Sequence, residues 1–189
     1  NSTVASYNLQ RPSYINYIYT GPCGTAFYNP DTSSTQDTSV FSTTFSNLRV
    51  EQFTYRGFDF RSLVRTGNVY SNIYLTTGST GVSPNIATLS CDTLFYLGGG
   101  ESESSIHQLN TEWATFYTAA IVFEGCSNIA ASTIHIEHAT PGANNVPFIK
   151  TNKSCGTIQS LTIYGNYYPV SQDPTVTGTS FFQCNSSAN

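Results

Sequence analysis

The chain has 189 residues, of which 10% are charged and 14% are aromatic, and its formal net charge is −4. The negative charge argues against a partner with a phosphate backbone, so we expect no nucleic-acid binding. Hydrophobicity is too high and net charge too low for a disordered chain. No apolar run approaches the roughly 18 residues that a membrane-spanning helix needs, so we expect no membrane insertion.

Residues 1–45 show no clear repeat and contain several turn signals. These include Arg11-Pro12, Gly21-Pro22 and Asn29-Pro30. We expect a lead-in or cap here, because a cap would cover the strand edge of the structure that follows.

Residues 46–189 repeat a short phrase in which a small polar corner precedes an alternating apolar strand. The phrase reads Ser46-Asn47-Leu48 and then Ser71-Asn72-Ile73, and it returns more loosely as Cys91-Asp92-Thr93-Leu94. Strands with turn signals at such close spacing indicate all-β structure. The recurrence predicts a parallel β-solenoid, in which uneven turns are accommodated as loops.

The longest departure from this repeat is Gly98–Tyr117. It opens with three glycines and an acidic, Ser-rich stretch, and it contains Trp113, the only Trp of the chain. Scaffolds place binding groups on such excursions, so we expect a functional loop here.

Three cysteines near the end, Cys126, Cys155 and Cys184, lie 29 residues apart. The even period predicts that they stack in one column of buried thiols, which behave as small hydrophobes. A disulfide between two of them is the alternative, whereas a metal site is disfavoured because Cys-x-x-Cys spacing is missing. The segment that ends in Cys184 begins a turn that the chain does not complete, so we expect the natural protein to continue past Asn189.

Carboxylates are the first candidates for catalysis, because glycoside hydrolysis uses a pair of them. In Ile134-His135-Ile136-Glu137, alternation places His135 and Glu137 on one outward face. With Glu124, they form the predicted catalytic cluster. Solvated outer-face residues are the plainer interpretation. His138 has the opposite parity to His135, so no metal site is predicted there.

Four arginines fall close together and are interleaved with acidic residues. They are Arg49, Arg56, Arg61 and Arg65, between which lie Glu51 and Asp59. Ordinary ion pairing explains the arrangement, and a binding patch for an acidic polysaccharide is the alternative.

Aromatic side chains are the candidates for sugar binding, because a ring offers a flat apolar face and a Tyr hydroxyl adds hydrogen bonds. The predicted set is Trp113, Tyr117, Tyr164, Tyr167 and Tyr168. Contact between subunits explains the same residues equally well.

The recurrent corners resemble those of pectate-lyase-like right-handed parallel β-helices, as found in bacteriophage tailspikes and related tail appendages. The corners that support the resemblance are Asn47-Leu48, Asn72-Ile73, Thr93-Leu94, Asn128-Ile129 and Thr157-Ile158. The resemblance implies an elongated homotrimer, located on a virion or outside the cell, that recognises a host-surface polysaccharide. No catalytic motif of that family matches, so no active-site residue is transferred from it.

Two hypotheses follow. The first is a segment of a viral tail appendage that binds a glycan, and the second is a secreted polysaccharide-degrading enzyme, either a glycoside hydrolase or a lyase. Neither hypothesis calls for a cofactor.

Overall fold

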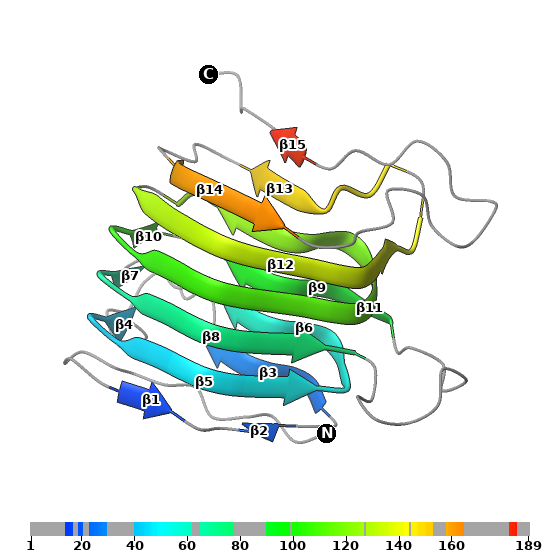
Figure 1. Cartoon of the computed structure of the whole chain (residues 1–189), viewed down its shortest axis with the longest axis horizontal. Coiled ribbons are helices and arrows are strands. Elements are labelled where there is room, and N and C mark those ends of the chain that lie inside the picture. Colours follow the sequence, from blue (N-terminus) through cyan, green and yellow to red (C-terminus); the bar gives the residue numbers. More distant parts are fainter. Residues whose placement is uncertain are drawn as a thin grey trace.

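The computed structural model describes residues 14–16, 19–20, 23–29, 40–61, 65–77, 90–98, 100–126, 128–143, 145–152, 158–164 and 182–184. Within this part the chain forms 15 strands and no helix. Neighbouring strands pair in parallel, and their ribbons lie one above another (Figure 1). The predicted all-β parallel solenoid is therefore confirmed.

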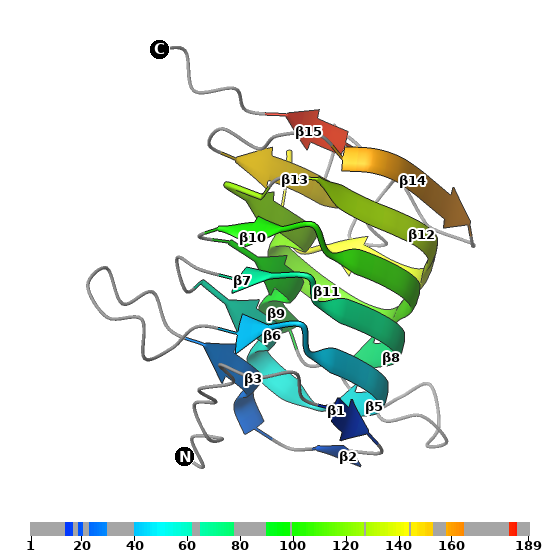
Figure 2. The same cartoon turned by 90° about the vertical axis from the view of Figure 1, so that its left-hand side faces the viewer.

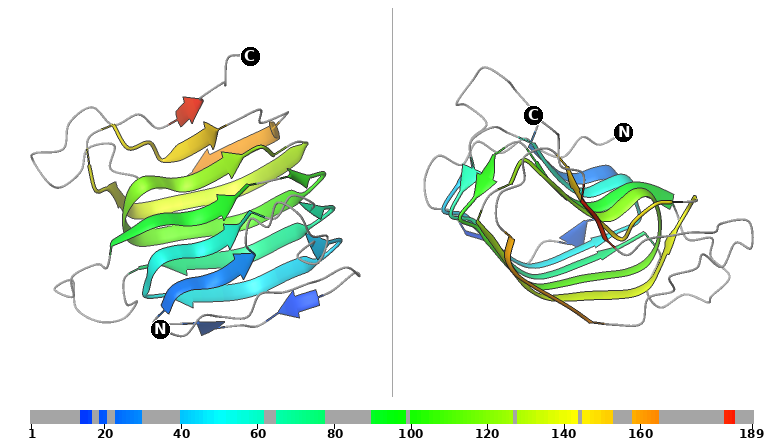
Figure 3. Two further views of the ribbon diagram at one scale, coloured as in Figure 1. Left: turned by 180° about the vertical axis from the view of Figure 1, so that it is seen from behind. Right: turned by 90° about the horizontal axis from the view of Figure 1, so that it is seen from above.

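The strands gather into two long faces and one short sheet. Face A contains β1 (Tyr14–Asn16), β2 (Tyr19–Thr20), β5 (Thr44–Glu51), β8 (Val69–Thr76), the first part of β11 (Ser105–Glu124), β12 (Ile129–Pro141) and β14 (Ile158–Tyr164). Face B contains β3 (Cys23–Asn29), β6 (Phe53–Phe60), β9 (Ser90–Leu97), the last part of β11, β13 (Ile149–Asn152) and β15 (Phe182–Cys184). The short sheet contains β4 (Val40–Phe41), β7 (Arg65–Thr66) and β10 (Glu101–Ser102), which stack together in Figure 2. Seen along the stack, the faces enclose the interior (Figure 3).

Strands also form within the segment for which a cap is predicted. Tyr14 of β1 pairs with Thr44 of β5, and Phe27 of β3 pairs with Phe58 of β6. These strands join the same parallel stack, so the segment before residue 46 supplies strands to both faces.

Strand β11 links the two faces without a loop. Its first part pairs with β8 and β12, and its last part pairs with β9 and β13. The prediction of a functional loop over Gly98–Tyr117 is therefore wrong for most of that segment, because Ser105–Tyr117 is a central strand. The Gly-rich opening misled the sequence interpretation, since only a few residues around β10 form the turn that leads into this strand.

A bend runs through the middle of face A at one residue in each of the four strands β5, β8, β11 and β12. Asn47, Asn72, Gln108 and Thr133 occupy corresponding register positions, and each has a positive φ of 51–61°. The left-handed conformation suits Asn better than most L-residues. It also interrupts the alternation of side chains, so the buried positions follow a spacing of three and then two residues. Examples are Phe45-Leu48-Val50 and Tyr70-Ile73-Leu75.

The predicted corners are not all equivalent. Asn128 also has positive φ, but the register places it opposite Glu103, at the corner that precedes face A. Thr93 lies within β9 on face B, where it is buried. Asn47 and Asn72 are thus a true repeat, whereas Asn128 and Thr93 share only the local phrase. Thr157 lies outside the described residues.

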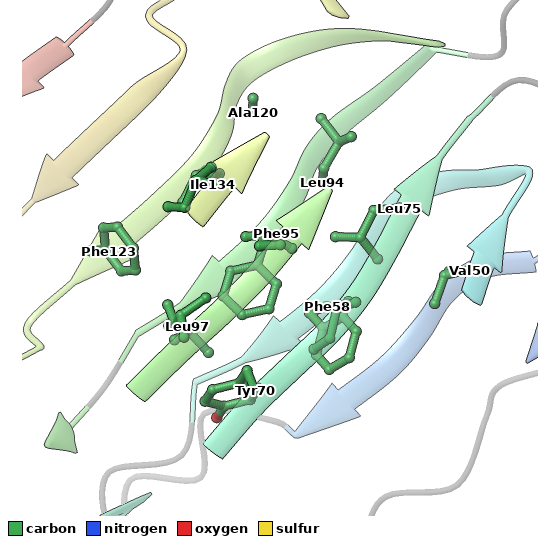
Figure 4. Packing of buried hydrophobic residues seen from close by; sticks show 14 of the residues in the cluster. Val50, Phe58, Tyr70, Leu75, Leu94, Phe95, Leu97, Ala120, Phe123 and Ile134 are labelled. Atoms are coloured by element: carbon green, nitrogen blue, oxygen red, sulfur yellow. The ribbon is translucent and has the colours of Figure 1, made fainter. Parts of the chain in front are cut away.

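The interior is filled by aromatic and aliphatic side chains from both faces (Figure 4). The rings of Phe45 and Tyr70 stack with centroids 5.2 Å apart, and those of Phe27 and Phe58 stack at 4.6 Å. Each of these rings is almost fully buried. Like side chains therefore pile up along the solenoid, and this burial is the main source of its stability.

The cysteine column does not form as predicted. Cys184 pairs with Thr151, and Thr151 pairs with Phe123. Cys184 therefore lies in the column of Phe123, while Cys126 follows three residues later along the chain. Even spacing in sequence fails to predict the register because successive turns differ in length. Cys126 is buried, and its thiol donates a hydrogen bond of 3.3 Å to the backbone oxygen of Leu97. Cys155 lies outside the described residues.

Candidate functional site

The outward side of face A presents polar side chains in columns that cross the strands. One column contains Arg49, Tyr74, Asn110 and His135. A second register column contains Glu51, Thr76, Glu112 and the backbone of Glu137, and within it Thr76 and Glu51 are buried. Both follow from the alternation of each strand after its bend, because the residues between them point into the core.

Contacts connect these two columns into one network. The Nε of Arg49 lies 2.6 Å from Oε1 of Glu51, and its guanidinium lies 4.5 Å from the centroid of the Tyr74 ring. The Tyr74 hydroxyl donates a hydrogen bond of 3.1 Å to Oε2 of Glu112. Burial raises the pKa of the Tyr74 phenol, and the nearby Glu112 carboxylate raises it further. Tyr74 therefore remains a neutral hydrogen-bond donor to Glu112.

Glu112 is the centre of the candidate site. Its Oε1 lies 3.7 Å from Nδ1 of His135, a contact that becomes an ion pair when the imidazole is protonated. Glu137 is the register partner of Glu112 on the adjacent strand. Neighbouring strands are about 4.8 Å apart, so the backbones of Glu112 and Glu137 lie side by side.

The structure separates the three residues predicted as a catalytic cluster. His135 and Glu137 both lie on β12 of face A. Glu124 ends β11 on face B, opposite Asn152, and its carboxylate accepts a hydrogen bond from Tyr96. Glu112 takes the place expected for Glu124.

Trp113 follows Glu112 at the point where β11 turns from face A to face B. Its φ of 47° is unusual for a bulky residue, and its side chain is 41% exposed. Tyr117, four residues further on, is 53% exposed, and its ring lies against Gly142. These two predicted sugar-binding residues are therefore exposed on β11 after Glu112.

The tyrosines predicted near the end of the chain are described in part. The backbone of Tyr164 pairs with that of His135, which puts it in the Arg49 column. Tyr167 and Tyr168 lie outside the described residues.

The arginines form ion pairs, which confirms the plainer interpretation for Arg49, Arg56 and Arg61. On face B, the guanidinium of Arg56 lies 2.9 Å from Asp59 and 2.7 Å from Asp92. Arg61 lies 2.8 Å from Asp59. Burial would lower the pKa of Arg56, but the two carboxylates outweigh it and the pKa is raised. Of Arg65 only the backbone is described, in β7.

Neither a metal centre nor a helical membrane span is found in the described part of the chain. No three His, Cys, Asp or Glu side chains there are arranged to hold a metal ion. Nor does that part contain a helix long and apolar enough to cross a bilayer.

Comparisons with protein families, with curated proteins and with solved structures find no match to this chain. The function of the chain is therefore inferred from its fold and from the side chains of face A.

Sequence reasoning counted Glu112 among the candidate carboxylates but left it out of the predicted cluster, because it assigned this residue to an insertion. The signal was present in the spacing of the buried residues. Ile106-Leu109-Thr111 has the same intervals as Phe45-Leu48-Val50 and Tyr70-Ile73-Leu75. Matching that pattern would have placed Glu112 in the column of Glu51.

Proposed function

We propose that this chain is a polysaccharide-binding segment that recognises its ligand along face A, with Trp113 as the main contact. The observation behind this proposal is the position of Trp113, exposed at the bend of β11 directly after Glu112. A sugar ring that packs on the indole would meet the carboxylate of Glu112 at its rim. Aromatic faces and carboxylate acceptors are well suited to the apolar faces and hydroxyl groups of a sugar.

The shape of the site supports an extended ligand. The column of Arg49, Tyr74, Asn110 and His135 runs across β5, β8, β11 and β12, and each of these side chains is at least partly exposed. Three strand spacings of about 4.8 Å give a length of roughly 14 Å, which suits several sugar units rather than one. A rigid sheet also holds these side chains in place before the ligand arrives, which reduces the entropic cost of binding.

The resemblance to bacteriophage tail appendages provides the biological setting of this proposal. In that setting the chain is a right-handed β-helix within a homotrimer, on a virion or outside the cell, and its ligand is a host-surface polysaccharide. Light scattering tests the assembly. A mass three times that of the chain supports it, and a monomer at micromolar concentration contradicts it.

Binding can be followed through Trp113, because it is the only Trp of the chain. A panel of capsular, cell-wall and plant polysaccharides is titrated into the protein while its tryptophan fluorescence is recorded. We expect at least one polysaccharide to shift the emission and to protect the indole from acrylamide quenching. Calorimetry then compares Trp113→Ala with Tyr55→Ala, which removes another exposed aromatic ring away from Glu112. Loss of binding only in Trp113→Ala supports the site, whereas equal binding by both variants contradicts it.

Hydrolysis is the second candidate function, and the register of Glu112 with Glu137 is the observation that favours it. Two carboxylates on adjacent strands can be separated by the distance that glycoside hydrolases use, about 5 to 10 Å. His135, beside Glu112, could assist proton transfer.

The enzyme hypothesis is tested by the release of reducing ends from the polysaccharide that binds. Activity should disappear in Glu112→Gln and Glu137→Gln and persist in Glu124→Gln, which alters a carboxylate on face B. Loss of activity in Glu124→Gln and Glu137→Gln, with activity retained in Glu112→Gln, would favour the cluster predicted from the sequence. Binding without any products would leave recognition as the function.

A further inference from the structure

The basic groups that could attract an acidic glycan are occupied by carboxylates. Arg49 pairs with Glu51 on face A, and Arg56 and Arg61 share Asp59 on face B. Lys150 lies on β13, opposite Val122, and therefore belongs to face B. Among the described side chains of face A, Arg49 alone carries a permanent positive charge, and this charge is balanced by Glu51.

Glu112 retains capacity to accept hydrogen bonds from a ligand. An ionised carboxylate offers about four lone-pair sites. Tyr74 occupies one of them at 3.1 Å, and the imidazole of His135 lies 3.7 Å from the other oxygen. Sugar hydroxyls are donors that match the remaining sites, whereas a second carboxylate would be repelled by the like charge.

We propose that the glycan bound at Trp113 and Glu112 is uncharged and that this site discriminates against sugars that bear a carboxylate. The inference rests on the proposed function and assigns the ligand class to the same site. It also decides between the two interpretations of the arginines, because their ion pairs leave no basic patch for an acidic polysaccharide on the described part of face A.

The test uses matched ligands that differ only in charge. Polygalacturonate and hyaluronan are each compared with the same polymer after its carboxyl groups have been reduced to alcohols. Capsular uronic-acid polysaccharides are treated in the same way, and the fluorescence of Trp113 reports binding. In the reduced polymer a hydroxyl can donate a charge-assisted hydrogen bond to Glu112, whereas in the acidic polymer a carboxylate at the same position is repelled by Glu112. We therefore expect the reduced form to bind at least about tenfold more tightly than the acidic form.

Variants connect the preference to Glu112. Glu112→Gln should lower the ratio of the affinity for the reduced polymer to that for the acidic polymer by about tenfold, because it removes the like charge and keeps the side-chain shape. Glu112→Lys should favour the acidic form. Glu103→Gln is the matched control, because it removes the same charge at an exposed corner that precedes face A, and it should leave the ratio unchanged.

The outcomes separate this inference from the proposed function. Equal or tighter binding of the acidic polymers contradicts the inference while leaving a polysaccharide-binding function in place. The same holds if Glu112→Gln leaves the ratio unchanged, or alters it no more than Glu103→Gln does. If no polymer in either form binds, the proposed function is wrong, and the inference is wrong with it.

Discussion

The side-chain amide of Asn72 donates a hydrogen bond of 2.6 Å to the amide oxygen of Asn47 on the neighbouring strand. Both residues adopt positive φ, and together they form the bend of face A. The recurrent Ser-Asn phrase therefore has a physical cause. Asn tolerates the left-handed conformation, and stacking its amide on the same residue of the next turn satisfies part of its hydrogen-bonding capacity.

Substitutions at Asn72 should separate conformation from hydrogen bonding. Asn72→Val should lower the free energy of unfolding by about 1–2 kcal/mol, because a β-branched residue strongly disfavours positive φ. Asn72→Gly should cost less, since glycine adopts this conformation readily. Urea denaturation measures both. Asn110→Ala, on the same side of the sheet but without positive φ, is the control. A Val variant as stable as the Gly variant would contradict the role of the bend.

Glu101 is buried in the corner between the short sheet and face A, where it accepts three hydrogen bonds. Its donors are the Asn68 amide at 3.0 Å, the Tyr70 hydroxyl at 3.2 Å and the Ser104 hydroxyl. Glu101→Ala removes the acceptor of these buried donors, and each unsatisfied group costs about 1–3 kcal/mol.

Thermal and urea denaturation should therefore show a large loss of stability in Glu101→Ala. Glu101→Gln should lose less stability than Glu101→Ala, because its amide oxygen still accepts hydrogen bonds. The control is Glu103→Ala, an exposed position where changes usually stay within about 0.5 kcal/mol. If both alanine variants unfold at the same urea concentration, the buried network contributes little.

Gly57 lies where two strands of face B approach closely. A Cβ at this position would lie 2.7 Å from the backbone oxygen of Leu94 and 3.2 Å from side-chain atoms of Leu75 and Phe53. A backbone atom cannot move aside as a flexible side chain can, so Gly57→Ala should destabilise the fold by about 1–3 kcal/mol. Gly24→Ala is the matched control, because no atom lies within 4 Å of its added Cβ. A Gly57→Ala protein with the same melting temperature as the wild type would contradict this close approach of Gly57 to Leu94.

Cys91 should make stability fall at alkaline pH. Burial raises the pKa of its thiol above the ordinary value of 9.0, and the nearby Asp92 raises it further. Above pH 9 the unfolded chain loses this proton while the folded chain keeps it, so the free energy of unfolding decreases as pH rises towards the folded pKa. Urea denaturation between pH 8 and pH 10 should show a smaller decrease in Cys91→Ala than in the wild type. If the free energy of unfolding falls equally with pH in the wild type and in Cys91→Ala, the folded protein does not keep this thiol protonated.

The sequence by itself determined the local conformations of this protein. The recurrent Ser-Asn phrase and the apolar positions Ile134 and Ile136 can be recognised from residue types and their intervals. The structure gives Asn47 and Asn72 a positive φ within strands, where the sequence predicts corners, and it buries both isoleucines. Such features depend on sterics and on the burial of neighbouring side chains along one strand. They are sufficient to predict a parallel solenoid, and a common outward face for His135 and Glu137 stays a prediction.

Only the tertiary structure decided which side chains meet across strands. Thr44 pairs with Val69, 25 residues later, but Val69 pairs with Ser105, 36 residues later. Because the connections between strands vary in length, spacing along the chain does not reveal the register. The register placed Glu112 rather than Glu124 beside His135, and it moved Cys184 out of the column of Cys126. Columns of side chains arise from the hydrogen-bonded pairing of whole strands, and that pairing is a property of the folded stack.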